Sequence, residues 1–168
     1  MRRVVTGLNA AGKSAVLFDG APPTHAEVPV AGIEGYLIWM TDDTPADNAG
    51  SADRADCPFP AETAPPRGTC FFTFEYPSLA HASPEQFEAL MKGGHGSDTH
   101  DHPGMHISDT TDYMVVTSGE LTAIMEDGEA TLRPGDVMIN RGCYRAFENR
   151  GDGPVRFAVV TIGAAPRN

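Results

Sequence analysis

The chain has 168 residues, which suits one domain that buries its own core. Its formal net charge of −11 makes nucleic acid and anionic membranes poor partners, because charges of the same sign repel. Three cysteines are too few for a disulfide framework and fit a reducing compartment. No apolar run reaches the length of a membrane span, and Thr6, Gly7 and Asn9 interrupt any signal-peptide core. We therefore expect a cytoplasmic protein with a single domain over 1–168.

The first motif in chain order is Gly7–Ser14, which matches the P-loop pattern G-x-x-x-x-G-K-[ST]. A P-loop links a buried strand to a helix, and the N-terminus of that helix holds the phosphates. Here a strand-like run at 15–18 follows, and then Pro22 and Pro23, so no room remains for a helix. We expect a turn between two strands at this motif and no nucleotide binding.

Short apolar runs separated by turn residues predict a protein built almost entirely of strands. The Asp127-Gly128 pair between two such runs is a strong hairpin signal. Many short strands at this spacing predict a β-sandwich or a β-barrel. The expected strands are 15–18, 36–40, 70–76, 112–116, 121–125, 130–132, 137–139, 144–148 and 155–162.

Two segments depart from the strand pattern. Residues 84–92 are predicted to form a short helix, because Ser83 is a good N-cap and Gln86 completes a capping box. Residues 41–69 are rich in Asp, Ala and Pro and show no periodicity. We expect this arm to lie over the barrel surface, and the alternatives are a lid or a segment that crosses to a second subunit.

The most specific pattern in the chain consists of two spaced motifs. The first is His106-x-Ser108-x3-Asp112-x6-Gly119, and the second is Gly135-x6-Gly142-x2-Arg145-x3-Asn149. Their spacing resembles the two motifs of the cupin family, and the Arg-Arg-Val-Val-Thr-Gly opening resembles small bacterial and fungal single-domain cupins. The resemblance implies an all-β fold, the cupin double-stranded β-helix or jelly-roll barrel, with one short helix. The barrel motifs would lie within 104–162, and the N-terminal strands and arm within 1–103.

The metal ligands of the family are altered in this chain. The resemblance implies two histidines, a glutamate and a third histidine around a metal ion, and of these histidines only His106 remains. Ser108 is a poor ligand, and Asp112 is shorter than glutamate but can still coordinate a metal. Arg145 replaces the third histidine and has no lone pair to donate. The family's metal site therefore does not carry over.

Two substitutes for that site remain open. His100, His102 and His106 could join Asp112 as ligands for Zn, Fe or Ni. Alternatively no metal is bound, and Arg145 supplies the positive charge as the partner of Asp112 or as a clamp for a substrate carboxylate.

Alternate residues of a strand face the same side, so strand parity predicts which side chains meet inside the barrel. His106, Asp112 and Arg145 are the expected catalytic residues. The expected substrate contacts are Arg145, Ser108, Met114, Cys143 and Phe147.

The leading hypothesis is a lyase-type or isomerase-type enzyme that acts on a small oxygenated or aromatic organic acid. Proton transfer, dehydration or decarboxylation would be catalysed by His106 as general acid or base, while Asp112 orients it and Arg145 holds the anion. The alternatives are a non-catalytic small-ligand binding or sensor barrel, and a metal-dependent oxygenase that uses His100, His102 and His106. We also expect a homodimer, because small cupins commonly pair.

Overall fold

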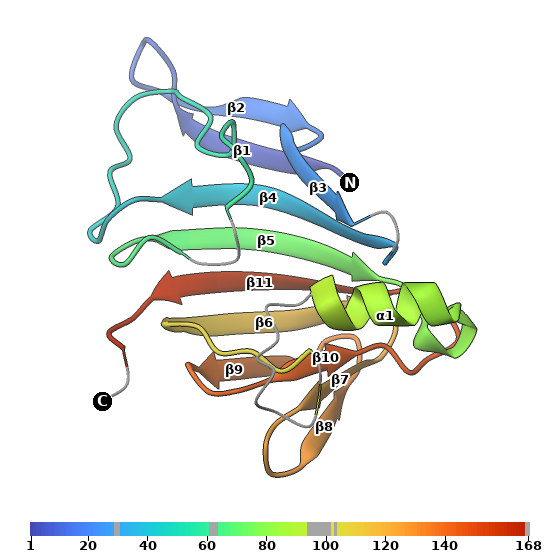
Figure 1. Ribbon diagram of the computed structural model, residues 1–168. Helices are drawn as coiled ribbons and strands as arrows, with labels where there is room; N and C mark the ends of the chain where they lie inside the picture. Colours follow the sequence, from blue (N-terminus) through green and yellow to red (C-terminus); the bar gives the residue numbers. More distant parts are fainter. Residues whose placement is uncertain (29–30, 61–63, 94–101, 103, 167–168) are drawn as a thin grey trace.

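The computed structural model describes residues 1–166 apart from 29–30, 61–63, 94–101 and 103 (Figure 1). Strands dominate the described residues, and one short α-helix accompanies them, so the predicted all-β class is confirmed. The elements are β1 (Arg3–Leu8), β2 (Ser14–Gly20), β3 (Thr24–Val28), β4 (Ile33–Thr41), β5 (Thr69–Tyr76), the 3-10 helix η1 (Leu79–His81), α1 (Pro84–Gly93), β6 (Thr110–Ser118), β7 (Leu121–Ile124), β8 (Glu129–Leu132), β9 (Val137–Arg141), β10 (Ala146–Glu148) and β11 (Val155–Gly163).

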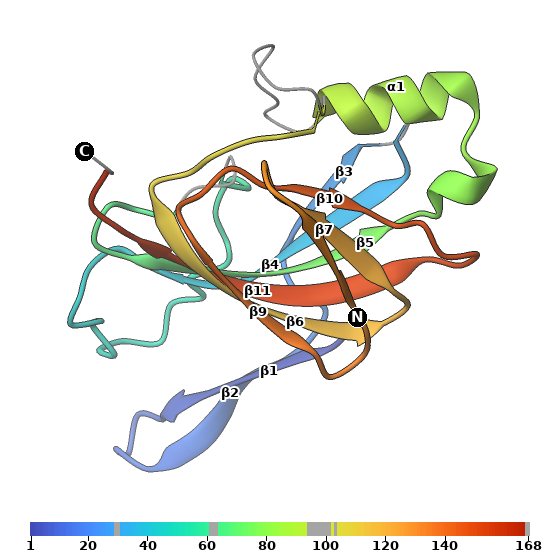
Figure 2. The ribbon, with the colours of Figure 1, turned by 90° about the horizontal axis from the view of Figure 1, so that it is seen from below.

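Two antiparallel sheets form the barrel. The larger has the strand order β3-β4-β5-β11-β6-β9, and the smaller has the order β10-β7-β8. Figure 2 shows the smaller sheet folded over one face of the larger, while the β1–β2 hairpin projects on the opposite side. The chain turns from β6 into β7 at Gly119, whose φ of 74° and close approach to Val155 leave no room for a side chain. This arrangement is the predicted cupin jelly-roll barrel.

The hydrophobic core lies between the two sheets. Along β6, alternate residues from Thr110 to Val116 are buried, which matches the period of two expected for a sheet with one covered face. The core side chains come from both sheets and from the arm, and they are Leu37, Ala55, Ala64, Cys70, Phe72, Met114, Val116, Leu121, Val155, Phe157 and Val159. The parity expected from the sequence therefore holds for β6.

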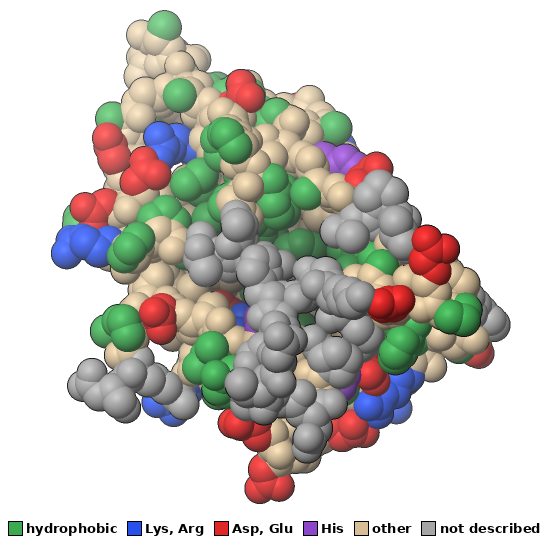
Figure 3. Space-filling model, viewed as in Figure 1, with side chains coloured by type: hydrophobic (Ala, Val, Ile, Leu, Met, Phe, Trp, Pro, Cys, Tyr) green, Lys and Arg blue, Asp and Glu red, His purple; other side chains and the backbone are tan. Residues whose placement is uncertain are grey.

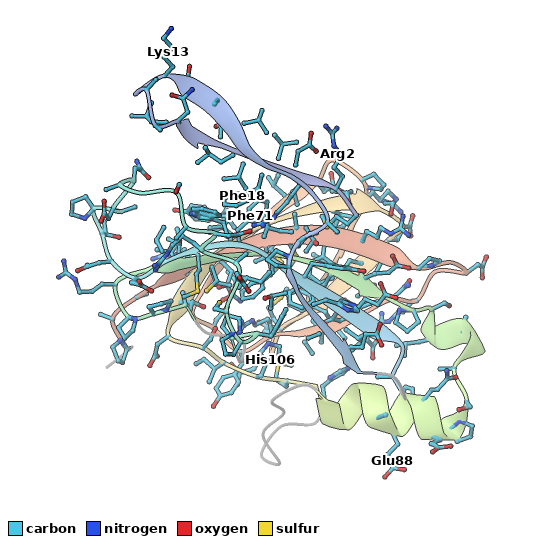
Figure 4. All side chains as sticks on the ribbon, turned by 90° about the horizontal axis from the view of Figure 1, so that it is seen from above. Arg2, Lys13, Phe18, Phe71, Glu88 and His106 are labelled. Atoms are coloured by element: carbon cyan, nitrogen blue, oxygen red, sulfur yellow. The ribbon has the colours of Figure 1, made fainter. Side chains whose placement is uncertain are left out.

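Several local expectations are confirmed. The Ser83 and Gln86 capping box is present, since the Ser83 N–H donates to Gln86 Oε1 at 2.9 Å and the Gln86 N–H donates to Ser83 Oγ at 3.1 Å. The P-loop-like motif is the turn of the β1–β2 hairpin, with Lys13 at its tip (Figure 4). There Asn9 Oδ1 accepts the backbone N–H groups of Ala11 and Lys13, both at 3.0 Å. No helix in the described part of the chain is long and apolar enough to cross a membrane.

Two local expectations are wrong. Strand β3 was not expected, because Thr24–Val28 is short and half polar. The strand expected over 144–148 begins only at Ala146, because Arg145 makes a single isolated bridge with His106 and no continuous ladder.

The described part of the arm, between β4 and β5, packs against the barrel without regular structure. Ala55 is fully buried, and the ring of Phe59 lies 5.5 Å from that of Phe72. Arg3 binds Asp53 through both Nη atoms, and Thr24 Oγ1 donates to the carbonyl of Cys57 at 2.8 Å. The described part of the arm thus lies over the barrel, and Phe59 is also part of the cavity wall.

Candidate functional site

A cavity of about 170 Å³ lies inside the barrel. Aromatic rings form part of its wall and pack against one another: the centroid of Phe157 is 5.5 Å from that of Phe74, 5.2 Å from that of Tyr76 and 6.2 Å from that of Phe147. On the face seen in Figure 1, hydrophobic side chains gather over β4 and β5 (Figure 3). A dry cavity of roughly 150 Å³ is enough to hold benzene, so this one suits a ligand with about one ring.

Arg145 and Asp112 form a buried ion pair in the wall of the cavity. Arg145 Nη2 donates to Asp112 Oδ2 at 3.1 Å and to Ser108 Oγ at 2.9 Å. The other carboxylate oxygen of Asp112 accepts from Thr110 Oγ1 at 2.6 Å. The two residues are only 6% and 4% exposed, and both line the cavity. Each buried charge therefore has its opposite charge and further hydrogen bonds.

The backbone brings these residues together. Arg145 and His106 exchange two backbone hydrogen bonds of 3.0 Å, which join the segment before β6 to the segment before β10. Asp112 pairs with Thr161 of β11 in the next strand of the large sheet. The motif spacing thus placed His106, Ser108, Asp112 and Arg145 in one group, and the structure places them together.

His106 lines the cavity beside Arg145. Its Nδ1 lies 2.9 Å from the carbonyl oxygen of Gly104. Because a carbonyl only accepts, Nδ1 carries the proton, and a neutral imidazole then has its lone pair on Nε2. Figure 4 shows His106 and Phe71 on opposite sides of the large sheet, so His106 belongs to the inner side.

The cavity has a second polar group, in which His102 was a candidate residue and Glu148 was not expected from the sequence. His102 Nε2 donates to Glu148 Oε1 at 2.8 Å, and Arg150 Nε donates to Glu148 Oε2 at 2.6 Å. Burial acts to raise the pKa of Glu148, but the bonds from His102 and Arg150 outweigh it, so this pKa is lowered. Strand parity gave no signal for Glu148, because it would face away from Arg145 and Phe147 in a regular strand.

The described residues do not fit a divalent metal of the family type. No group of three or more His, Cys, Asp or Glu side chains in the described part of the chain could hold a metal ion. The two ring nitrogens of His102 are occupied by Glu148 and by the backbone N–H of Gly104. Asp112 is bonded to a guanidinium, which repels a cation. His100 lies outside the described residues.

Only some of the other predicted substrate contacts line the cavity. Met114 and Phe147 line the cavity, and Ser108 holds Arg145 without being part of the wall. Cys143 is not among the cavity residues, and its Sγ accepts from Asn140 Nδ2 at 3.3 Å. Asn149 was expected only as a motif position, yet it lines the cavity, and its Nδ2 donates to the carbonyls of Tyr76 and Gly153, at 3.0 and 2.8 Å.

The chain is similar to two curated proteins over part of its length. Two curated proteins of Diaporthe leptostromiformis, phomopsin biosynthesis cluster protein C′ and protein D, are each 36% identical over 64 residues. The match spans 37% of this chain and 34% of the length of each relative.

Two solved structures resemble the chain at low identity. One is the cupin domain of Schizosaccharomyces pombe Cnp3, with 10% identity and a TM-score of 0.49 over 96% of this chain and 86% of that one. The other is the Cupin_2 domain of an XRE family transcriptional regulator from Enterobacter cloacae, with 19% identity and a TM-score of 0.37 over 59% and 83%. Residues 86–161 match the family model of the cupin domain, Cupin_2. The matched segment includes both spaced motifs, so this part of the chain is similar to the cupin domain, in agreement with the barrel.

Proposed function

We propose that this protein binds a small oxygenated or aromatic organic acid in its barrel and that His106 transfers a proton to or from the bound molecule. One observation carries the proposal: a buried guanidinium, fixed by Asp112, lies in the wall of an aromatic cavity that His106 also lines. The protein would then be of the lyase or isomerase type.

The cavity chemistry supports an acid as the ligand. Arg145 presents planar N–H donors, a geometry that matches a carboxylate and allows one guanidinium to bond two carboxylates along different edges. Ser108 and Asp112 hold the guanidinium in place, so little side-chain entropy is lost on binding. The rings of Phe74, Phe147 and others offer flat apolar contact to an unsaturated or aromatic skeleton.

His106 supports proton transfer as the reaction type. Its bond to the Gly104 carbonyl fixes the tautomer, which leaves Nε2 as the basic atom. A general base beside an anion-holding arginine suits removal of a proton next to a carboxylate, as in isomerisation or in the elimination of water. The protonated imidazole would then return the proton to the product.

A non-catalytic binding or sensor barrel is the second candidate. It is favoured by the closed network around Asp112, in which both carboxylate oxygens already have a donor. Such a network would hold the barrel rigid around a ligand without taking part in chemistry.

Binding and proton transfer can be tested separately. In calorimetric titrations, benzoate should bind more tightly than its neutral isostere benzamide, and Arg145→Met should remove that preference. Deuterium incorporation from D2O into a panel of small keto and hydroxy acids should be lost in His106→Gln while benzoate still binds. Equal affinity for benzoate and benzamide would overturn the anion site, and exchange that persists in His106→Gln would leave only the binding barrel.

We further propose that the protein is a homodimer. Phe71, Tyr113 and Ile139 are exposed on the outer face of β5, β6 and β9, and Tyr113 is the cross-strand neighbour of Ile139. Apolar surface of this kind favours burial against a second copy. Sedimentation should give a dimer that Tyr113→Asp weakens, and a monomer at every concentration would contradict the proposal.

A further inference from the structure

The cavity holds a second polar group besides the Arg145–Asp112 pair, and its centre is a carboxylate. Glu148 lines the same cavity as Arg145, and its side chain is only 14% exposed. Each of its carboxylate oxygens accepts a bond, one from His102 at 2.8 Å and the other from Arg150 at 2.6 Å. A carboxylate has about four lone-pair sites, so two accepted bonds leave it able to accept more.

The surroundings of Glu148 keep it negatively charged. Burial opposes ionisation, yet the bonds from His102 and Arg150 lower the pKa of Glu148 overall. Arg150 does not cancel this charge by itself, because it also binds Glu129 at 2.9 and 3.0 Å. Two carboxylates thus share one arginine at this point of the barrel, and Glu148 is the one of the two that lines the cavity.

His102 acts here as a positioning residue. The backbone N–H of Gly104 donates to its Nδ1 at 3.1 Å, so the proton of the neutral ring is on Nε2, which donates to Glu148. The same residue, Gly104, accepts the Nδ1 proton of His106 through its carbonyl. One residue therefore fixes two opposite tautomers: the proton of His106 is on Nδ1, whereas that of His102 is on Nε2, where it binds Glu148.

Arg145 and Glu148 are separated along the wall. Three residues of extended chain place their Cα atoms about 10 Å apart. Phe147 lies between them in the sequence and also lines the cavity. A ligand that contacts both groups needs an acceptor at one end, a donor at the other and an apolar body between.

We infer that Glu148 is a specificity-determining residue that selects small cyclic or aromatic acids bearing a second group with an N–H or O–H donor, such as a hydroxyl. This inference rests on the proposed function, because it takes the acid group of the ligand to be bound by Arg145. An acid without the donor would meet only repulsion from Glu148, whereas a hydroxyl would gain a hydrogen bond to a carboxylate.

The test compares four probes by calorimetry: benzoate, 3-hydroxybenzoate, 4-hydroxybenzoate and 4-methoxybenzoate. At least one hydroxybenzoate should bind about tenfold more tightly than benzoate, which is the effect of one hydrogen bond to a charged group. The methoxy compound has no donor and should bind no more tightly than benzoate. This comparison uses the unaltered protein and does not depend on the folding of a variant.

Glu148→Gln should act on the probes in opposite directions. Benzoate should bind as well or more tightly, because a repelling charge is gone, while the hydroxybenzoate preference should fall below about threefold. The matched control is Glu129→Gln, which removes a carboxylate from the same arginine outside the cavity and should keep the tenfold preference.

The outcomes separate the two proposals. If benzoate binds and depends on Arg145 but the hydroxyl brings no gain, the inference on Glu148 is overturned and the proposed function stands. If none of the four probes binds, the proposed function fails for aromatic acids, and the inference fails with it. A hydroxyl preference that Glu148→Gln leaves unchanged would assign the preference to another residue.

Discussion

Two arginines in this barrel are buried against aspartates, and they lie in different surroundings. Arg3 binds Asp53 through both Nη atoms, donates to the carbonyl of Ile38 at 2.9 Å, and has its guanidinium carbon 5.7 Å from the ring centre of Phe18. Arg145 binds Asp112 and is equally buried, at 6% exposed against 7% for Arg3. Arg145 lines the cavity, whereas Arg3 does not.

The difference shows that a buried arginine–aspartate pair is not by itself a sign of function. The Arg3 pair joins β1 to the arm and also contacts Ile38 and Phe18, so it links separate segments of the chain. The Arg145 pair uses the same chemistry, but its guanidinium lies beside His106 in a space that can admit a ligand. The two pairs should therefore respond differently to mutation and to ligand.

The largest effect is expected for Arg145→Ala. It leaves the Asp112 carboxylate buried without its cation, which should lower the free energy of unfolding by about 3–5 kcal/mol, as measured by urea denaturation. Benzoate binding should be lost as well. The control is Arg145→Ala combined with Asp112→Ala, which should recover part of the lost stability, because no buried charge is then stranded. A loss within about 0.5 kcal/mol would place Arg145 among ordinary surface residues.

A smaller loss is expected for Arg3→Ala. Asp53 is 16% exposed, so water can reach part of the stranded carboxylate, and the loss should be about 1–3 kcal/mol in the same urea experiment. The arm should become more sensitive to limited proteolysis, because it loses its bond to β1. Benzoate affinity should stay within about threefold of the unaltered protein. Loss of benzoate binding in Arg3→Ala would contradict the expectation that only the Arg145 pair affects ligand binding.

The pH dependence of stability should reveal the Arg3 pair. Burial raises the pKa of Asp53, but the bonds from Arg3 and from the Ala55 backbone outweigh it, so the pKa is lowered in the folded state. Its contribution to stability is then fully present above the unfolded value of about 3.9 and is lost as the pH falls through the folded value. Urea denaturation between pH 7 and pH 2.5 should show that the difference between the unaltered protein and Asp53→Asn shrinks below about pH 4. A difference that is constant over this range would contradict the role of the charge.

The sequence predicted the Arg145 pair and could not predict the Arg3 pair. Arg145 and Asp112 lie at fixed positions of two spaced motifs, and strand parity turns such positions into a shared face. Asp53 lies in an aperiodic arm, 50 residues from Arg3, where neither spacing nor period connects the two. Contacts of that kind depend on how a loop lies on the barrel, which local patterns do not encode.

Glu148 and the histidines show a second limit. In a regular strand Glu148 would face away from Phe147, yet both line the cavity. The roles of His102 and His106 depend on which ring nitrogen meets the N–H or the carbonyl of Gly104, and a sequence contains no such information. Residue types and spacing predicted the Arg145 side of the cavity, and only the geometry placed Glu148 in its wall.

The smallest effect is expected from nickel binding to Arg145→His, which tests whether the arginine alone keeps the family's metal chemistry out of this barrel. The new imidazole would lie beside His106 and Asp112, so three side chains that can bind a metal would replace the ion pair. The positive charge of the guanidinium, which repels a metal ion, would be gone. After dialysis against nickel, metal analysis should find more Ni²⁺ in Arg145→His than in Arg145→Gln, which removes the same charge without adding a ligand. The accompanying stabilisation would be slight, about 0.4 kcal/mol when free nickel equals its Kd. Arg3→His is the control from the other pair and should bind no more nickel than the unaltered protein. Equal nickel content in Arg145→His and Arg145→Gln would show that His106 and Asp112 cannot converge on a metal. The arginine would then not be what keeps a metal out of the barrel.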